Sequence, residues 1–120
     1  AVAYVLEKFG KIDVLMNLAG AGKPIAAVDV TIEQWEGIFQ VFLRSTFLFC
    51  QAVGRHMLER GKGSIINVSS VASVIARGYG TAGYSAAKAG VTNAQASTIK
   101  TSTATAAIRV GGIMNRGTCV

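Results

Sequence analysis

The sequence is short of the residues that build disulfide frameworks and metal centres. It contains two cysteines, Cys50 and Cys119, and a single histidine, His56. Two cysteines so far apart predict no disulfide framework, and Cys50 lies in an apolar segment, where it is expected to pack as a small hydrophobic side chain. Because no cluster of Cys, His and carboxylate side chains surrounds His56, we expect a surface role for it and no metal site.

Acidic residues are also scarce, and none follows Glu59. The chain has 12 Lys and Arg against 6 Asp and Glu, which gives a formal net charge of +6. A basic face attracts nucleic acid, but the cations of the second half are scattered and no aromatic stacking pattern accompanies them. We therefore expect no nucleic-acid partner. The charge fits either attraction of an anionic cofactor or an acidic part located elsewhere in the protein.

No targeting segment is recognised in the sequence. The apolar run near the middle of the chain is interrupted by Arg44 and is too short to span a bilayer, and no signal peptide is seen. Together with the unpaired cysteines, these features predict a cytoplasmic protein without a membrane partner.

Two apolar segments read as buried parallel strands with polar carboxyl ends. Residues 12–17 end at Asn17 and are followed by Gly20, while residues 64–70 end at Ser70. Strands of a parallel sheet are covered on both faces and are rich in β-branched residues. Ligands bind beyond the carboxyl ends of such strands, so Ser70 could donate a hydrogen bond to a substrate oxygen there.

Tyr84 and Lys88 are the residues that indicate chemistry most directly. Side chains four residues apart lie on one face of a helix. An ammonium near a phenol favours the phenolate, and such a tyrosine can exchange a proton with an alcohol or carbonyl oxygen. The alternative is a half-buried aromatic ring beside a solvated lysine, because this spacing often occurs by chance.

Several linked motifs in one order resemble the short-chain dehydrogenases/reductases. The matching segments are FGKIDVL at residues 9–15, NLAG at 17–20, IINVSS at 65–70, YSAAKAGV at 84–91 and IRV at 108–110. The resemblance covers residues 1–93 and returns at the last of these segments. It implies a Rossmann-type α/β fold and a nicotinamide cofactor, NAD or NADP, with a small alcohol or ketone as substrate.

The resemblance also implies roles for individual residues. Tyr84 would be the general acid/base, Lys88 would favour its phenolate and hold the nicotinamide ribose, and Ser70 would orient the substrate oxygen. The cofactor cleft would be lined by Asn17, Ala19 and Gly20, together with Tyr84 and Lys88.

The chain departs from the family pattern at several places. Leu18 stands where a second asparagine is usual, and Phe42 stands where an asparagine usually completes a proton relay. A phenyl ring cannot hold a water or an ammonium by hydrogen bonding. The sequence after residue 110 lacks the usual Pro-Gly turn. Residues 97–105, where the second helix should continue, are rich in hydroxyl and β-branched side chains. No glycine-rich βα turn for a pyrophosphate occurs in the 120 residues.

The remaining patterns complete the predicted organisation. A capping box from Thr31 to Gln34 predicts a long helix that ends at Gly61. A second helix is expected over residues 83–101, a last strand over 107–113, and the end of a helix before residue 10. The expected fold is therefore a partial doubly wound parallel α/β sheet with three strands and two long helices. It forms a single partial Rossmann-like domain over residues 1–120, the central and catalytic portion of the family fold.

Two hypotheses for function follow from these patterns. The first is an NAD(P)-dependent oxidoreductase that interconverts a secondary alcohol and a ketone. The second is a truncated or decayed relative without catalysis that serves as an oligomerisation partner or has no activity. The resemblance implies a homo-oligomer through the two long helices, and the apolar positions of the first helix fit either a subunit contact or simple burial. The strand at residues 12–17 is expected to present an open apolar edge.

Overall fold

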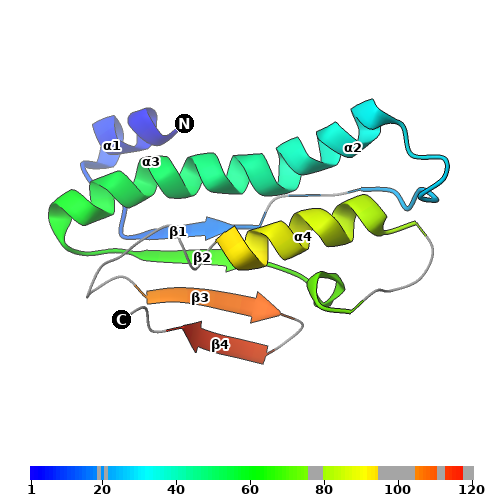
Figure 1. Ribbon diagram of the computed structural model, residues 1–120. Helices are drawn as coiled ribbons and strands as arrows, with labels where there is room; N and C mark the ends of the chain where they lie inside the picture. The colour runs from blue at the N-terminus through cyan, green and yellow to red at the C-terminus, as the bar shows by residue number, and fades with distance from the viewer. Residues whose placement is uncertain (19, 21, 76–79, 95–104, 111–112, 118–120) are drawn as a thin grey trace.

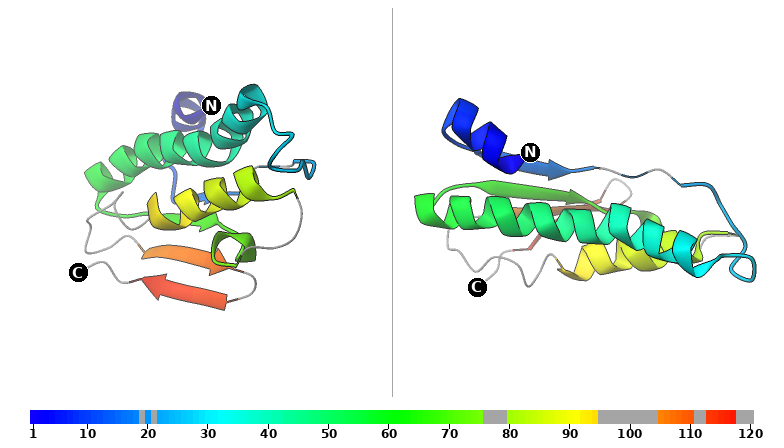
Figure 2. Two further views of the ribbon diagram at one scale, coloured as in Figure 1. Left: turned by 45° about the vertical axis from the view of Figure 1, so that its right-hand side comes forward. Right: turned by 90° about the horizontal axis from the view of Figure 1, so that it is seen from above.

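The computed structural model describes residues 1–18, 20, 22–75, 80–94, 105–110 and 113–117, the last two ranges by their backbone alone. The elements in chain order are α1 (Val2–Phe9), β1 (Val14–Asn17), α2 (Ile32–Phe39), a π turn (Gln40–Arg44), α3 (Ser45–Arg60), β2 (Ser64–Val68), a short 3₁₀ helix (Val71–Ser73), α4 (Ala82–Ala94), β3 (Thr105–Val110) and β4 (Ile113–Gly117). The α/β class is confirmed, and α3 and α4 lie side by side over one face of the sheet (Figures 1 and 2).

The sheet has the strand order β1-β2-β3-β4, with β1 at one edge. β1 to β3 are parallel, whereas β4 pairs antiparallel with β3 (Figure 1). The prediction of three strands was therefore wrong, because the sheet has four. The single strand predicted over residues 107–113 overlaps both β3 and β4. The sequence signal that we missed is the Gly111 and Gly112 pair, a composition typical of two-residue hairpin turns.

One face of β1 packs against α3, and the other face is exposed. Leu15 and Ile65 are register partners and pack against Cys50, Val53 and Met57 of α3. On the opposite face Val14 and Met16 are 57% and 55% exposed. Alternation along a strand puts these two sets on opposite sides. The predicted apolar open edge at β1 is thus found in the described part of the chain, together with an apolar face beside it.

The long central helix is built as predicted at both ends. The Thr31 side chain accepts from the backbone N–H of Gln34, the Gln34 side chain accepts from that of Thr31, and Gly61 ends the helix at φ 63°. Between them, the π turn widens the helix at residues 40–44 without ending it. Ser45 and Thr46 donate their hydroxyls to the carbonyl oxygens of Val41 and Phe42. These bonds supply partners where the regular ladder is shifted.

The helix from Ile32 to Arg60 has 29 residues and is apolar enough, by length and composition, to cross a membrane. Our expectation that the apolar run is too short to span a bilayer was wrong by length and composition, because the helix stays apolar on both sides of Arg44. The core helix of a globular α/β domain has the same length and composition. Cys50, Val53 and Met57 of this helix pack against β1 and β2, and 22% of its apolar window is buried.

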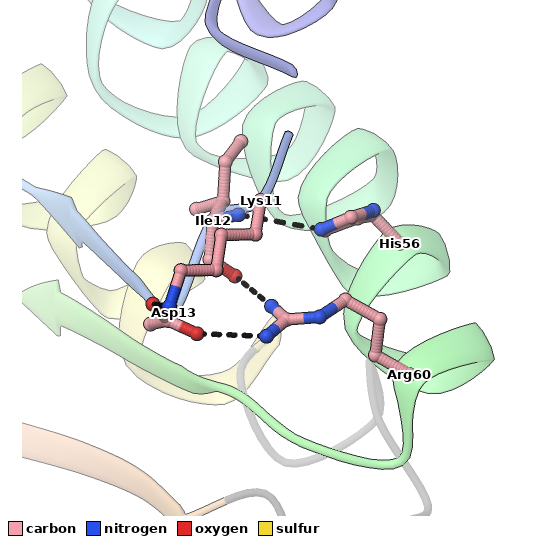
Figure 3. Close-up of polar contacts among 5 residues, drawn as sticks. All are labelled: Lys11, Ile12, Asp13, His56 and Arg60. Atoms are coloured by element: carbon pink, nitrogen blue, oxygen red, sulfur yellow. Dashed lines mark hydrogen bonds and ion pairs between the residues drawn. The ribbon is translucent and has the colours of Figure 1, made fainter. Parts of the chain in front are cut away.

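A polar clamp joins the end of α3 to the start of β1 (Figure 3). Arg60 donates to the carbonyl oxygen of Ile12 at 3.0 Å and pairs with Asp13 at 2.9 Å, while Lys11 pairs with Asp13 at 3.1 Å. Hydrogen bonds from Arg60 and then from Lys11 hold the pKa of Asp13 below its ordinary value. His56 accepts a hydrogen bond from the Ile12 N–H at 3.3 Å, so this half-buried histidine has a structural partner rather than a purely surface role.

Candidate active site

α4 places Tyr84 and Lys88 one turn apart, as their spacing predicts. The Lys88 Nζ lies over the Tyr84 ring, 5.9 Å from its centroid. Lys88 is 6% exposed, and its Nζ donates to the carbonyl oxygen of Val68, the last residue of β2, at 2.8 Å. Burial lowers the pKa of Lys88. The lysine is therefore a buried ammonium at the carboxyl end of a strand, and the alternative of a solvated lysine is wrong.

Phe42 contacts both members of this pair from the π turn. Its ring stands edge-on to Tyr84, with centroids 5.1 Å apart and planes at 81°. The Lys88 Nζ lies 5.0 Å from the Phe42 centroid. Phe42 is 3% exposed, so the phenyl ring fills the space next to the tyrosine and the lysine. An aromatic contact with an ammonium at this distance is a cation–π interaction.

The Phe42 ring occupies space that a side chain at position 20 would fill. A Cβ on Gly20 would lie 1.7 Å from a ring carbon, and the residue has φ +139°. Any side chain at this position would meet the ring and would strain the backbone. Gly20 thus packs its backbone against Phe42. The cofactor role that the resemblance implies for Gly20 stays a prediction. Ala19, the other predicted cofactor residue of this segment, lies outside the described residues.

Ser70 follows β2 and begins the 3₁₀ helix. Its Oγ accepts from the Ala72 N–H at 3.2 Å, which caps that helix. Within the described ranges no hydrogen bond joins Ser70 to Tyr84 or Lys88. The Ser70 hydroxyl also donates to none of the described residues.

Ser69 is a residue of this region that sequence reasoning missed. It is buried, donates to the carbonyl oxygen of Lys88 at 3.0 Å, and shares a 2.6 Å hydrogen bond with Thr92. These bonds fix α4 to the end of β2, and so they fix the height of Tyr84 and Lys88 above the sheet. The available signal was the serine pair itself, since consecutive residues leave a strand on opposite sides.

Asn17 points into the covered side of the sheet. Its amide donates to the Oδ1 of Asn67 at 2.7 Å and to the Sγ of Cys50 at 3.4 Å. The Cys50 thiol in turn lies 3.4 Å from the Asn67 Oδ1, and burial raises its pKa. Asn67, also missed from sequence, is the register partner of Asn17. This buried polar group ties β1, β2 and α3 together where the two strands end.

A cavity of about 280 Å³ opens beside Tyr84. It lies between the segment after β1, α2 and the start of α4, and the backbone N–H of Ile25 donates to the Gly80 carbonyl oxygen across its rim. Of the predicted site residues, Tyr84 and Gly20 line it, whereas Ser70, Lys88 and Asn17 do not. Its wall is mainly apolar, and Lys23 is the charged residue among the described residues that line it. The lining is formed by Gly20, Gly22, Lys23, Pro24, Ile25, Val30, Ile38, Phe42, Gly80, Thr81, Gly83 and Tyr84.

α4 places Tyr84 and the buried Lys88 beside the carboxyl end of β2, the side on which open α/β sheets bind ligands. The sequence model described as short chain dehydrogenase matches residues 1–118. The chain is 41% identical over 87 residues to a D-threitol dehydrogenase of Mycolicibacterium smegmatis, covering 72% of this chain and 33% of the relative. It is 42% identical over 86 residues to a 3-oxoacyl-[acyl-carrier-protein] reductase of Synechocystis sp., covering 72% of this chain and 34% of the relative.

Solved structures agree with these sequence matches. The acetoin dehydrogenase YohF from Salmonella typhimurium superposes with a TM-score of 0.75 at 35% identity, over 81% of this chain and 40% of that one. The chain belongs to the short-chain dehydrogenase/reductase family, as its motifs predicted. It spans about a third of the length of the curated relatives it matches.

Proposed function

We propose that this protein catalyses the NAD(P)-dependent interconversion of a secondary alcohol and a ketone, with Tyr84 as the general acid/base. The observation that carries the proposal is that Tyr84 lines the cavity while the buried Lys88 ammonium lies over its ring. In alcohol oxidation the phenolate oxygen of Tyr84 takes the hydroxyl proton, and in ketone reduction the phenol returns a proton to the carbonyl oxygen. Lys88 favours the phenolate that this exchange requires.

The residues present fit the sugar end of a nicotinamide cofactor. An ammonium has three N–H donors, and Lys88 uses one of them on Val68, which leaves two for ribose hydroxyls. Gly20, with Asn17 and Ala19 before it, would border the cofactor at the end of β1. When bound, the nicotinamide supplies the hydride chemistry. Ser70 would donate its O–H to the substrate oxygen and hold it near Tyr84.

The test is a hydride-transfer assay with the full-length protein that carries this sequence. Reduced nicotinamide is followed by absorbance with NAD and with NADP across small secondary alcohols and ketones that fit a mainly apolar cavity. Transfer with one cofactor and at least one substrate is expected. Absence of transfer in every combination contradicts the proposal.

A second candidate function is association without catalysis, which the apolar outer face of the long helix favours. Val41, Phe47 and Leu48 are between 47% and 49% exposed on this helix. A shallow groove of about 650 Å³ runs along it to the end of α4 at Ala94. We propose a homo-oligomer formed through α3 and α4 in either case. A cytoplasmic location, without membrane or nucleic-acid partners, remains a prediction.

Sedimentation velocity tests the oligomer. Phe47→Glu places a charge in the exposed face and is expected to convert the assembly to monomers, because an uncompensated charge is costly to bury. Lys62→Glu, on the loop after α3, is the control and should leave the assembly unchanged. A wild-type protein that sediments as a monomer contradicts the proposed interface.

A further inference from the structure

The Lys88 ammonium is buried among few polar partners. It donates one hydrogen bond, to the carbonyl oxygen of Val68 at 2.8 Å. The ion pairs of the described residues are those of Asp13 with Lys11 and Arg60, so no described carboxylate pairs with Lys88. The titratable group beside it is the phenol of Tyr84, on its own helix. A buried charge with one neutral hydrogen-bond partner needs further stabilisation.

The Phe42 ring is placed to supply that stabilisation. The Lys88 Nζ lies over it at 5.0 Å from the centroid, nearer than to the Tyr84 centroid at 5.9 Å. The negative face of an aromatic ring attracts a cation within about 6 Å, and the attraction is larger when both groups are shielded from water. Phe42 and Lys88 are both buried.

The backbone on two sides fixes this ring. Phe42 belongs to the π turn, whose carbonyl oxygens at Val41 and Phe42 accept the hydroxyls of Ser45 and Thr46. On the other side the ring lies against Gly20, where no side chain could be accommodated. Single π turns inside α-helices occur often at functional sites. The turn directs Phe42 inward while its neighbour Val41 stays exposed.

We propose that Phe42 is a positioning residue whose ring holds the Lys88 ammonium in its charged form beside Tyr84. The effect of Phe42 on turnover rests on the proposed function. Its stabilisation of the Lys88 charge does not. An aliphatic side chain of similar size would bury the ammonium as well but would offer it no negative ring face. The ring, rather than its bulk, is therefore what Lys88 requires.

The test is a pH titration of lysine side chains by NMR, on the full-length protein labelled at the lysine Cε. The Lys88 signal is assigned by its loss in Lys88→Arg. Wild type is compared with Phe42→Leu and with a protein carrying a trifluorinated phenylalanine at position 42, which keeps the ring's shape but weakens its negative face. The Lys88 midpoint is expected to fall by roughly one pH unit in both variants. Only a fall in both supports the proposal; an unchanged midpoint in either overturns it.

Hydride-transfer assays on the same three proteins separate this inference from the proposed function. If wild type transfers no hydride, the proposed function fails, and the titration still decides the role of Phe42. If wild type is active, the alkaline limit of kcat/KM should move down in both variants together with the NMR midpoint. An alkaline limit that stays in place overturns the positioning role, because a merely structural change would lower the rate without shifting it.

Discussion

Two tyrosine–lysine pairs with the same spacing occur in this chain, and their surroundings are opposite. Tyr4 and Lys8 on α1 bring the ammonium to 5.8 Å from the ring centroid, and Tyr84 and Lys88 on α4 bring it to 5.9 Å. Tyr4 is 61% exposed and Lys8 is exposed, whereas Lys88 is buried. The distance from the ammonium to the ring centroid is thus nearly the same in the two pairs, and the pairs differ in how far the surrounding protein buries them.

Three features surround the α4 pair, whereas the second ring beside the α1 pair, Phe9, is exposed. The Val68 carbonyl oxygen binds the Lys88 ammonium, the Phe42 ring packs against both side chains, and the cavity reaches Tyr84. In water an ammonium near a phenol changes its acidity little, because the solvent screens the charge. The comparison teaches that the spacing identifies a candidate and that enclosure at the carboxyl end of a strand distinguishes one pair from the other.

Replacing each lysine in turn tests whether the ammonium matters in one pair and not in the other. Lys88→Met is expected to lower kcat/KM on the order of a hundredfold, since it removes the ammonium beside the group proposed to transfer the proton. Lys8→Met should leave kcat/KM at the wild-type value. The measurement is steady-state hydride transfer by both variants, and equal losses in the two would remove the distinction between the pairs.

Gly20 tests the enclosure around Phe42. Gly20→Ala should reduce the free energy of unfolding by about 3 kcal/mol, because the new Cβ meets the Phe42 ring and the backbone has a positive φ. Gly22→Ala, two residues away with open space around it, should change the free energy of unfolding by no more than about 0.5 kcal/mol. Urea denaturation of both proteins gives the comparison, and similar midpoints would show that the ring is not held there.

The pH dependence of the free energy of unfolding also distinguishes the two lysines, with a smaller expected effect than the substitutions above. Burial lowers the pKa of Lys88 in the folded state below its unfolded value, so the unfolded chain binds more protons between the two values. The free energy of unfolding contributed by this group therefore rises with pH across that window. Lys88→Met should remove this rise and Lys8→Met should retain it. Urea midpoints measured across the alkaline range would decide, and parallel curves for all three proteins contradict the assignment.

The sequence was sufficient wherever a feature depends on neighbours along the chain. The capping box from Thr31 to Gln34, the helix end at Gly61 and the turn that stacks Tyr84 over Lys88 all follow from local spacing. The parallel pairing of β1 with β2 followed from two apolar segments separated by a long helix. The capping box, the helix end and the Tyr84–Lys88 spacing were strong signals because each one depends on backbone geometry within a few residues.

The arrangement of the site depended on contacts between distant segments. The inward turn of Phe42 requires a π turn, which composition does not reveal, and a glycine 22 residues earlier to make room. The amide of Asn17 found a partner in Asn67, 50 residues away, rather than an open cleft. Ser70 bonds to its own turn. Side-chain direction at a strand end is set by such partners, so the residue types could be predicted and their orientations could not.

The most direct measurement is the ratio of kcat/KM between the two tyrosine variants. Tyr84→Phe removes one hydroxyl at the cavity, and Tyr4→Phe removes the same group from the exposed pair. Loss of a positioned proton donor costs about 10²- to 10⁴-fold in rate, so Tyr84→Phe should fall by that factor while Tyr4→Phe retains wild-type turnover. Turnover in Tyr84→Phe equal to that in Tyr4→Phe would contradict a proton-transfer role for Tyr84.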